Sequence, residues 1–80
     1  MPSTLERVQS IFQDVLEQPT LFVTRADSGN TVDAWDSLAH IAIIASVEGE
    51  FGVRFALGEL EELKNIGDML DLIEVKLARS

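Results

Sequence analysis

The sequence of 80 residues contains no cysteine. Without a thiol, the polypeptide forms no disulfide and no thiolate metal site, and it has no sulfur nucleophile of its own for redox or thioester chemistry. Histidine occurs once and tyrosine not at all. Any thiol chemistry therefore requires a group supplied from outside the chain.

Basic residues are also scarce: 6 Lys and Arg stand against 14 Asp and Glu, for a formal net charge of −8. This charge repels nucleic acid and anionic lipid, so neither is an expected partner and a charged partner should be basic. The longest apolar run, 41–45, is far shorter than the roughly 20 residues of a membrane-spanning helix, and no signal peptide pattern is present. We expect no membrane association and a cytoplasmic location.

Apolar residues are plentiful, since 46% of the chain is hydrophobic and 25% is charged, a balance typical of chains that fold. A chain of this length has room for only one hydrophobic core. We therefore expect a single domain over residues 1–80, and a monomer.

Apolar residues recur at the helical period in segments bounded by capping residues and helix breakers. Ser3 and Glu6 form a capping box, while Asp36 and Asn65 are good N-cap residues and Gly52 supplies a left-handed stop. The pattern predicts helices over about 4–18, 37–51, 57–63 and 66–78. No strand is expected, so the predicted fold class is an all-α bundle of three longer helices and one short helix.

The segment 19–35 shows no period and contains the turn signal Ser28-Gly29-Asn30. A loop of this length in so small a chain is either functional or contains a missed element. The predicted helix after it is apolar around much of its circumference, which indicates burial on more than one side or an exposed binding face.

Ser37 is one candidate for chemistry, but a weak one on position alone: it follows the capping residue Asp36 at the positive end of a predicted helix. A phosphate ester would be stabilised there, although serine at a helix start is also common for capping reasons alone. Pairing with His40, one turn away, would suggest a hydrolase, but so small a bundle has little to exclude water or to build an oxyanion site. The acidic segment 59–62 could at most attract hard cations loosely, so no metal site is expected.

Several further features follow one another between Trp35 and Ile73. They are Asp36-Ser37-Leu38, the apolar helix after it, Phe51 at its end, Phe55, the short segment 57–63 and Asn65-Ile66-Gly67-Asp68-Met69-Leu70. In this combination the chain resembles the acyl carrier protein family, while the first 30 residues match in pattern only. The resemblance implies an acyl-carrier-like four-helix bundle, and a carrier protein without turnover of its own rather than an enzyme.

The resemblance also implies that a phosphopantetheinyl transferase attaches 4′-phosphopantetheine from coenzyme A to Ser37. The thiol of this arm would carry acyl or related intermediates as thioesters, and tethering would raise their effective concentration for each partner enzyme. The implied partners are acyl-loading and acyl-transfer enzymes with basic or apolar docking patches, in fatty acid, polyketide or another specialised biosynthesis. By similarity, the residues that would meet these partners are Asp36, Leu38, Ile41, Ala45 and Glu48.

Other positions would face inward, where the family can shelter an acyl chain, although ordinary core packing is the alternative for each. They are Ile43, Val47, Phe51, Phe55 and Leu70. The sequence departs from the usual acidic pattern of fatty acid carriers at Ala39, Ala42 and Gly49. This departure favours a specialised pathway, and the absence of linker composition at either end favours a stand-alone carrier. A small helical adaptor, with Ser37 at a helix start and no prosthetic group, is the alternative from another class.

Overall fold

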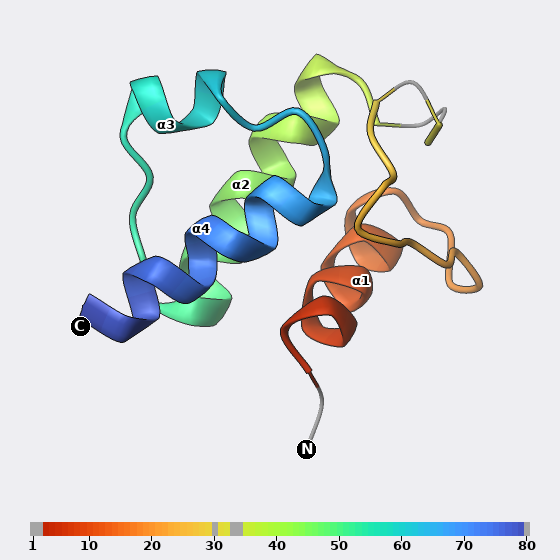
Figure 1. Ribbon diagram of the computed structural model, residues 1–80. Coiled ribbons are helices and arrows are strands. Elements are labelled where there is room, and N and C mark those ends of the chain that lie inside the picture. The colour runs from red at the N-terminus through yellow and green to blue at the C-terminus, as the bar shows by residue number, and fades with distance from the viewer. Residues whose placement is uncertain (1–2, 30, 33–34, 80) are drawn as a thin grey trace.

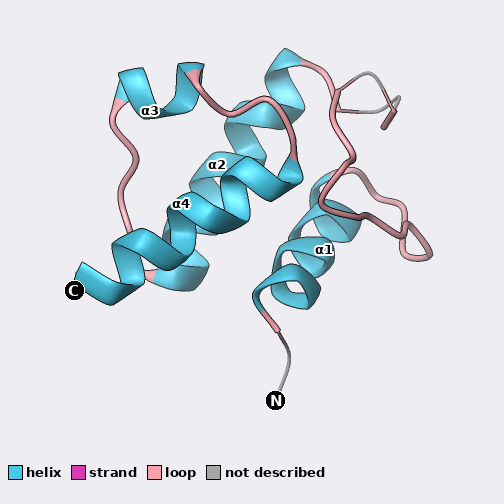
Figure 2. Ribbon diagram, viewed as in Figure 1, coloured by secondary structure: helices cyan, strands magenta, loops and turns pink. Residues whose placement is uncertain are grey.

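Four α-helices make up the fold in the computed structural model, which describes residues 3–29, 31–32 and 35–79. They are α1 (Thr4–Val15), α2 (Ser37–Phe51), α3 (Leu57–Glu61) and α4 (Ile66–Arg79), arranged as Figure 1 shows. The described part of the chain contains no strand (Figure 2). The predicted all-α class, with three longer helices and one short one, is therefore confirmed.

Capping residues fix the boundaries that the sequence predicts best. The Ser3 hydroxyl accepts a hydrogen bond from the Glu6 N–H at 3.2 Å, and the Glu6 carboxylate accepts one from the Ser3 N–H at 3.3 Å. At the start of α2, the Asp36 carboxylate accepts from the Ala39 N–H at 2.8 Å. Gly52 ends α2 in the left-handed region at φ 67°, where glycine carries no steric penalty. Both ends of α2 agree with the prediction.

The predicted ends of the first and third helices are wrong by a few residues. α1 ends at Val15 because Glu17 adopts a left-handed φ of 55°, two residues before Pro19 restricts the backbone further. α3 ends at Glu61, so Leu63 lies in the connection to α4. Apolar spacing alone extended both helices too far, because it does not show where the backbone leaves the helix, as it does at the left-handed Glu17 after α1.

The hydrophobic core lies where α1 packs against α2 and α4. The most deeply buried side chains come from these helices and from the loop after α1, and they are Val8, Phe12, Val23, Ile43, Val47, Ile66, Met69 and Ile73. α2 also leaves Leu38 and Ile41 exposed, at 79% and 66% of their surface. Its apolar character therefore has two causes, a buried side and an exposed apolar face.

The long segment between α1 and α2 is pinned to the helices at several points. Val23 is fully buried, and its N–H donates to the Gln9 side-chain oxygen at 3.0 Å. The Leu21 carbonyl accepts from the Gln13 amide at 2.9 Å. Asn30, the last residue of the predicted turn, lies outside the described residues.

The same segment also supplies hydrogen-bond acceptors to the start of α4. The carbonyl oxygens of Asp27 and Arg25 accept from the N–H groups of Ile66 and Gly67 at 2.9 and 2.8 Å. The Arg25 guanidinium also pairs with Asp71 at 2.8 Å. These contacts satisfy N–H groups that a helix start leaves without intrahelical partners, and they hold the loop across α4.

Candidate functional site

Ser37 is the first residue of α2, and its side chain is exposed. The preceding residue holds the first helical turn in place: the Asp36 carboxylate binds the Ala39 N–H, and its carbonyl oxygen accepts from the His40 N–H at 2.8 Å. No described residue hydrogen-bonds the Ser37 hydroxyl. This hydroxyl is thus open to an external enzyme at the positive end of α2, where a phosphate ester is stabilised.

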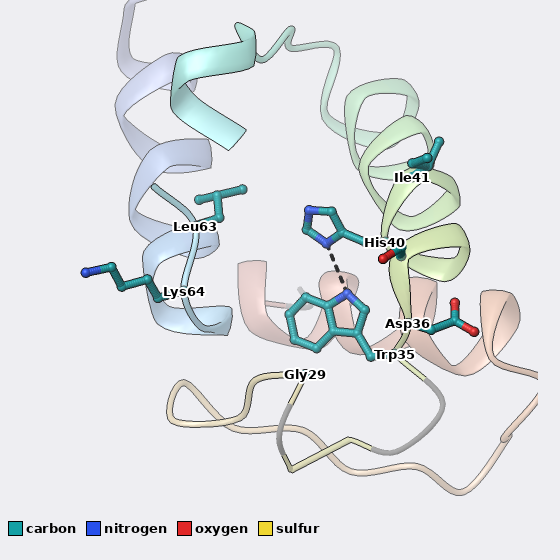
Figure 3. A pocket seen from close by; sticks show the side chains of 8 residues that line it. Gly29, Trp35, Asp36, His40, Ile41, Leu63 and Lys64 are labelled. Carbon is teal, nitrogen blue, oxygen red and sulfur yellow. Dashed lines mark hydrogen bonds between the residues drawn. The ribbon is translucent and has the colours of Figure 1, made fainter. Parts of the chain in front are cut away.

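An open cavity of about 580 Å³ lies beside Ser37, within the range of about 300–1,000 Å³ that is typical of ligand pockets. Its walls come from the loop before α2, the first turns of α2 and the connection between α3 and α4 (Figure 3). The lining residues are Gly29, Trp35, Asp36, Ser37, His40, Ile41, Leu63 and Lys64. Among these residues Asp36 and Lys64 are charged, and Figure 3 shows both side chains extending away from the imidazole of His40.

Trp35 and His40 form a hydrogen-bonded pair in the cavity wall. The indole Nε1 of Trp35 donates to the imidazole Nδ1 of His40 at 3.0 Å, and the two rings lie 5.8 Å apart at an interplanar angle of 27°. Phe12 meets the indole edge-on, with ring centroids 4.8 Å apart. Trp35 is half-buried, and its hydrogen bond to His40 is an interaction that the sequence did not predict.

The hydrogen bond from Trp35 also bears on the hydrolase interpretation. In a Ser-His-Asp triad a carboxylate accepts from the Nδ1–H of the histidine, whereas here Nδ1 is itself the acceptor. Among the described residues, no hydrogen bond links Ser37 to His40. Burial lowers the pKa of His40, so the imidazole is neutral near pH 7. The structure does not assemble Ser37 and His40 as a nucleophile and an oriented base.

The residues expected to meet partner enzymes differ in their surroundings. Asp36, Leu38, Ile41 and Ala45 are exposed along α2. Glu48 is half-buried, and its carboxylate accepts from the Phe55 N–H at 2.8 Å. Glu48 therefore has a structural role that its position in the sequence did not reveal.

The inward positions behave as core residues. Four of them are buried, namely Ile43, Val47, Phe51 and Leu70, whereas Phe55 is half-buried.

In the acidic segment, the pKa of Glu59 is lowered by the hydrogen bond from the Ala56 N–H and by Lys76, which lies at 2.8 Å. The described residues contain no cluster of three histidines or acids suited to a metal ion, and no described helix is long and apolar enough to cross a membrane.

Fold and site together define a class of protein. A serine hydroxyl at a helix start, a cavity beside it and exposed apolar side chains on the same helix are the features of a small helical carrier, which presents a tethered group to other proteins.

Comparison with known proteins agrees with this class. A family model described as "Phosphopantetheine attachment site" matches residues 6–73. The acyl carrier protein of Thermosynechococcus vestitus is 39% identical over 75 residues, which cover 92% of this chain and 91% of that protein. The solution structure of holo acyl carrier protein from Geobacter metallireducens is 48% identical with a TM-score of 0.89, and the match covers 99% of this chain and 90% of that one. The chain therefore belongs to the acyl carrier protein family.

Membership confirms the resemblance stated from the sequence. The chain is a carrier and not an enzyme, and its cofactor is covalently bound phosphopantetheine, which supplies a terminal thiol when attached. The residues present fit this group, because an exposed hydroxyl begins α2 and an open cavity lies beside it. Members of the family interact with a phosphopantetheinyl transferase and with biosynthetic enzymes.

Proposed function

We propose that Ser37 receives the phosphopantetheine arm and that the chain presents acyl intermediates on this arm to the enzymes of a specialised biosynthetic pathway. The observation that carries the assignment is the exposed Ser37 hydroxyl at the first residue of α2, on the rim of the cavity. We further propose that residues 1–80 act as one carrier domain, monomeric and cytoplasmic.

In this proposal the residues before and after the serine have separate tasks. Asp36 holds the first turn of α2 through the Ala39 N–H, so the attachment residue keeps a fixed place. The positive end of α2 then lies beside the phosphate ester and favours its charge. Partner enzymes reach the arm over Leu38 and Ile41, which are exposed.

The docking face that supports a specialised pathway is apolar rather than acidic. Ala42 is exposed and Ala39 half-buried, at positions where fatty acid carriers of this family usually have acids. Glu48 is engaged by the Phe55 backbone. Docking should therefore depend on apolar contacts of Leu38 and Ile41 rather than on a row of charges.

Intact mass spectrometry tests the attachment site. The chain is incubated with coenzyme A and a broad-specificity phosphopantetheinyl transferase, and we expect a mass gain of one phosphopantetheine. Ser37→Ala should abolish the gain, while Ser46→Ala, a change of another exposed serine on α2, should leave it intact. A gain that persists in folded Ser37→Ala would show that the arm is attached elsewhere, and the absence of any gain would favour the adaptor alternative.

A further inference from the structure

One polar atom on the cavity wall has no partner within the described part of the chain. Trp35 engages Nδ1 of His40, whereas no described residue hydrogen-bonds Nε2. The described residues contain no side-chain nitrogen or oxygen that is buried without a partner, so Nε2 is accessible to solvent, and His40 is one of the residues that line the cavity. Figure 3 shows the imidazole between Trp35 and Leu63, with its second nitrogen turned away from the indole.

The hydrogen bond from Trp35 fixes the chemistry that Nε2 offers. A neutral imidazole has one donor nitrogen and one acceptor nitrogen. Nδ1 accepts from the indole, so the ring proton must lie on Nε2. The indole is itself held by its edge-on contact with Phe12. The pair therefore presents an N–H donor of fixed orientation to the cavity beside Ser37.

We propose that the Nε2–H of His40 donates to an amide carbonyl oxygen of the arm attached to Ser37, and that Trp35 is the positioning residue for this donor. The inference rests on the attachment proposed above. Three residues along a helix correspond to about 4.5 Å along its axis, so an arm that leaves Ser37 toward the cavity passes the imidazole.

Apolar residues of the cavity complete the binding surface. Leu63, from the connection between α3 and α4, and Ile41, from α2, line the same cavity as His40 and offer contacts to the methylene groups of the arm. A phosphopantetheine arm alternates amides with short methylene segments, so one fixed donor beside apolar walls matches its chemistry. The arm then rests in the cavity for part of the time and is not held wholly in solvent.

The single histidine makes the test direct. Chain labelled with ¹⁵N at histidine is compared before and after loading, with loading at Ser37 confirmed by intact mass and by the Ser37→Ala variant. We expect the Nε2 resonance to shift and its proton to exchange more slowly with water in the loaded form. Unchanged Nε2 signals in a fully loaded chain would overturn this inference and leave the attachment intact. Failure to load would overturn both.

Variants of the loaded chain measure the effect on the arm. Alkylation of the arm thiol by iodoacetamide should be about two- to tenfold faster in His40→Phe, as expected from the loss of one hydrogen bond. His40→Gln retains an N–H donor and should restore part of the protection, while Ser46→Ala serves as the control on the same helix. Equal alkylation rates in folded His40→Phe and the parent chain would overturn the inference. If His40→Phe does not fold, the ¹⁵N spectra of the parent chain before and after loading, together with the alkylation rate of His40→Gln, test the inference instead.

The role of Trp35 has a separate spectroscopic readout. Trp35→Phe removes the indole donor but keeps an aromatic ring, so the His40 ¹⁵N shifts should change from a pure Nε2–H form to a mixture of both tautomers. A structural role alone would lower stability without changing the tautomer. An unchanged tautomer in Trp35→Phe would show that the indole does not orient the histidine.

Discussion

The N-cap of α2 allows a structural role of Asp36 to be separated from a role in partner recognition. Its carboxylate accepts from the Ala39 N–H at 2.8 Å, yet the residue is exposed. Asp36→Ala removes both the acceptor and the negative charge. Asp36→Asn keeps an acceptor oxygen and removes only the charge. Because the two variants have the same net charge, the difference between their stabilities reports the hydrogen bond.

The expected magnitudes follow from the geometry of the cap. Loss of an N-cap acceptor costs about 1 kcal/mol, and loss of a negative charge at a helix start costs about 0.3–1 kcal/mol more. For a domain of this size, each kcal/mol lowers the melting midpoint by about 4–8 °C. We therefore expect a fall of roughly 5–15 °C for Asp36→Ala and of about a few degrees for Asp36→Asn.

Thermal melting followed by far-ultraviolet circular dichroism measures the effect of each variant on stability. The rate of arm attachment measures its effect on recognition by the transferase. If Asp36 acts only as a cap, Asp36→Asn should be loaded as fast as the parent chain. If its charge also meets the transferase, Asp36→Asn should be loaded more slowly than the parent chain. Equal melting midpoints for the two variants would refute the stabilising role of the bond to Ala39.

Three further predictions concern the loop contact, the histidine and the docking face. Gly67→Ala should destabilise the fold by about 1–3 kcal/mol in urea unfolding, because its Cβ would lie 3.1 Å from a backbone oxygen. Gly49→Ala is the matched comparison for this variant: an added Cβ there meets nothing within 4 Å, so the change should instead stabilise α2 by about 1 kcal/mol. Burial lowers the pKa of His40 from its ordinary 6.5, so the stability it provides is present above pH 6.5 and is lost as the pH falls through the folded pKa. Ala39→Asp combined with Ala42→Glu should improve acceptance by a fatty acid ketosynthase.

Each of these has an outcome that contradicts it. Equal urea midpoints for Gly67→Ala and the parent chain would show that the loop yields to the added methyl group. For the histidine, the free energy of unfolding is measured at about pH 7 and about pH 5, on either side of the ordinary histidine pKa of about 6.5. If His40→Phe loses as much stability between these two values as the parent chain does, the loss comes from other groups. Efficient use of the unmodified chain by fatty acid enzymes, with no gain from the two added acids, would contradict the apolar docking face.

The sequence predicts α2 well because both of its ends have local signals. Asp36 is a strong cap and Gly52 a strong stop, and each acts on its own turn of helix. The end of α1 was less predictable, because Glu17 adopts a left-handed φ although it is neither glycine nor asparagine, the residues that usually do so. Capping residues can be recognised in a sequence, whereas a single glutamate in the left-handed conformation cannot.

Contacts that depend on how the chain turns outside its helices could not be predicted in the same way. The indole of Trp35 reaches His40 only because the chain turns into α2 between them, and no helical or strand period produces that spacing. The carbonyl oxygen of Arg25 accepts from the N–H of Gly67, which lies 42 residues further along the chain. Ser37 and its exposed neighbours on α2 were identified by family resemblance, and their roles as attachment and docking residues stay predictions.

The hydrogen bonds that join the loop after α1 to the start of α4 have a consequence for the dynamics of the fold. Backbone amides in the first turn of a helix ordinarily exchange with solvent quickly, because no helical carbonyl protects them. Here the amides of Ile66 and Gly67 are bonded to Asp27 and Arg25, so they are released only when segments about forty residues apart separate. Their exchange rates should follow unfolding of the whole domain, and a break in the loop would free α4 from its first residue onward.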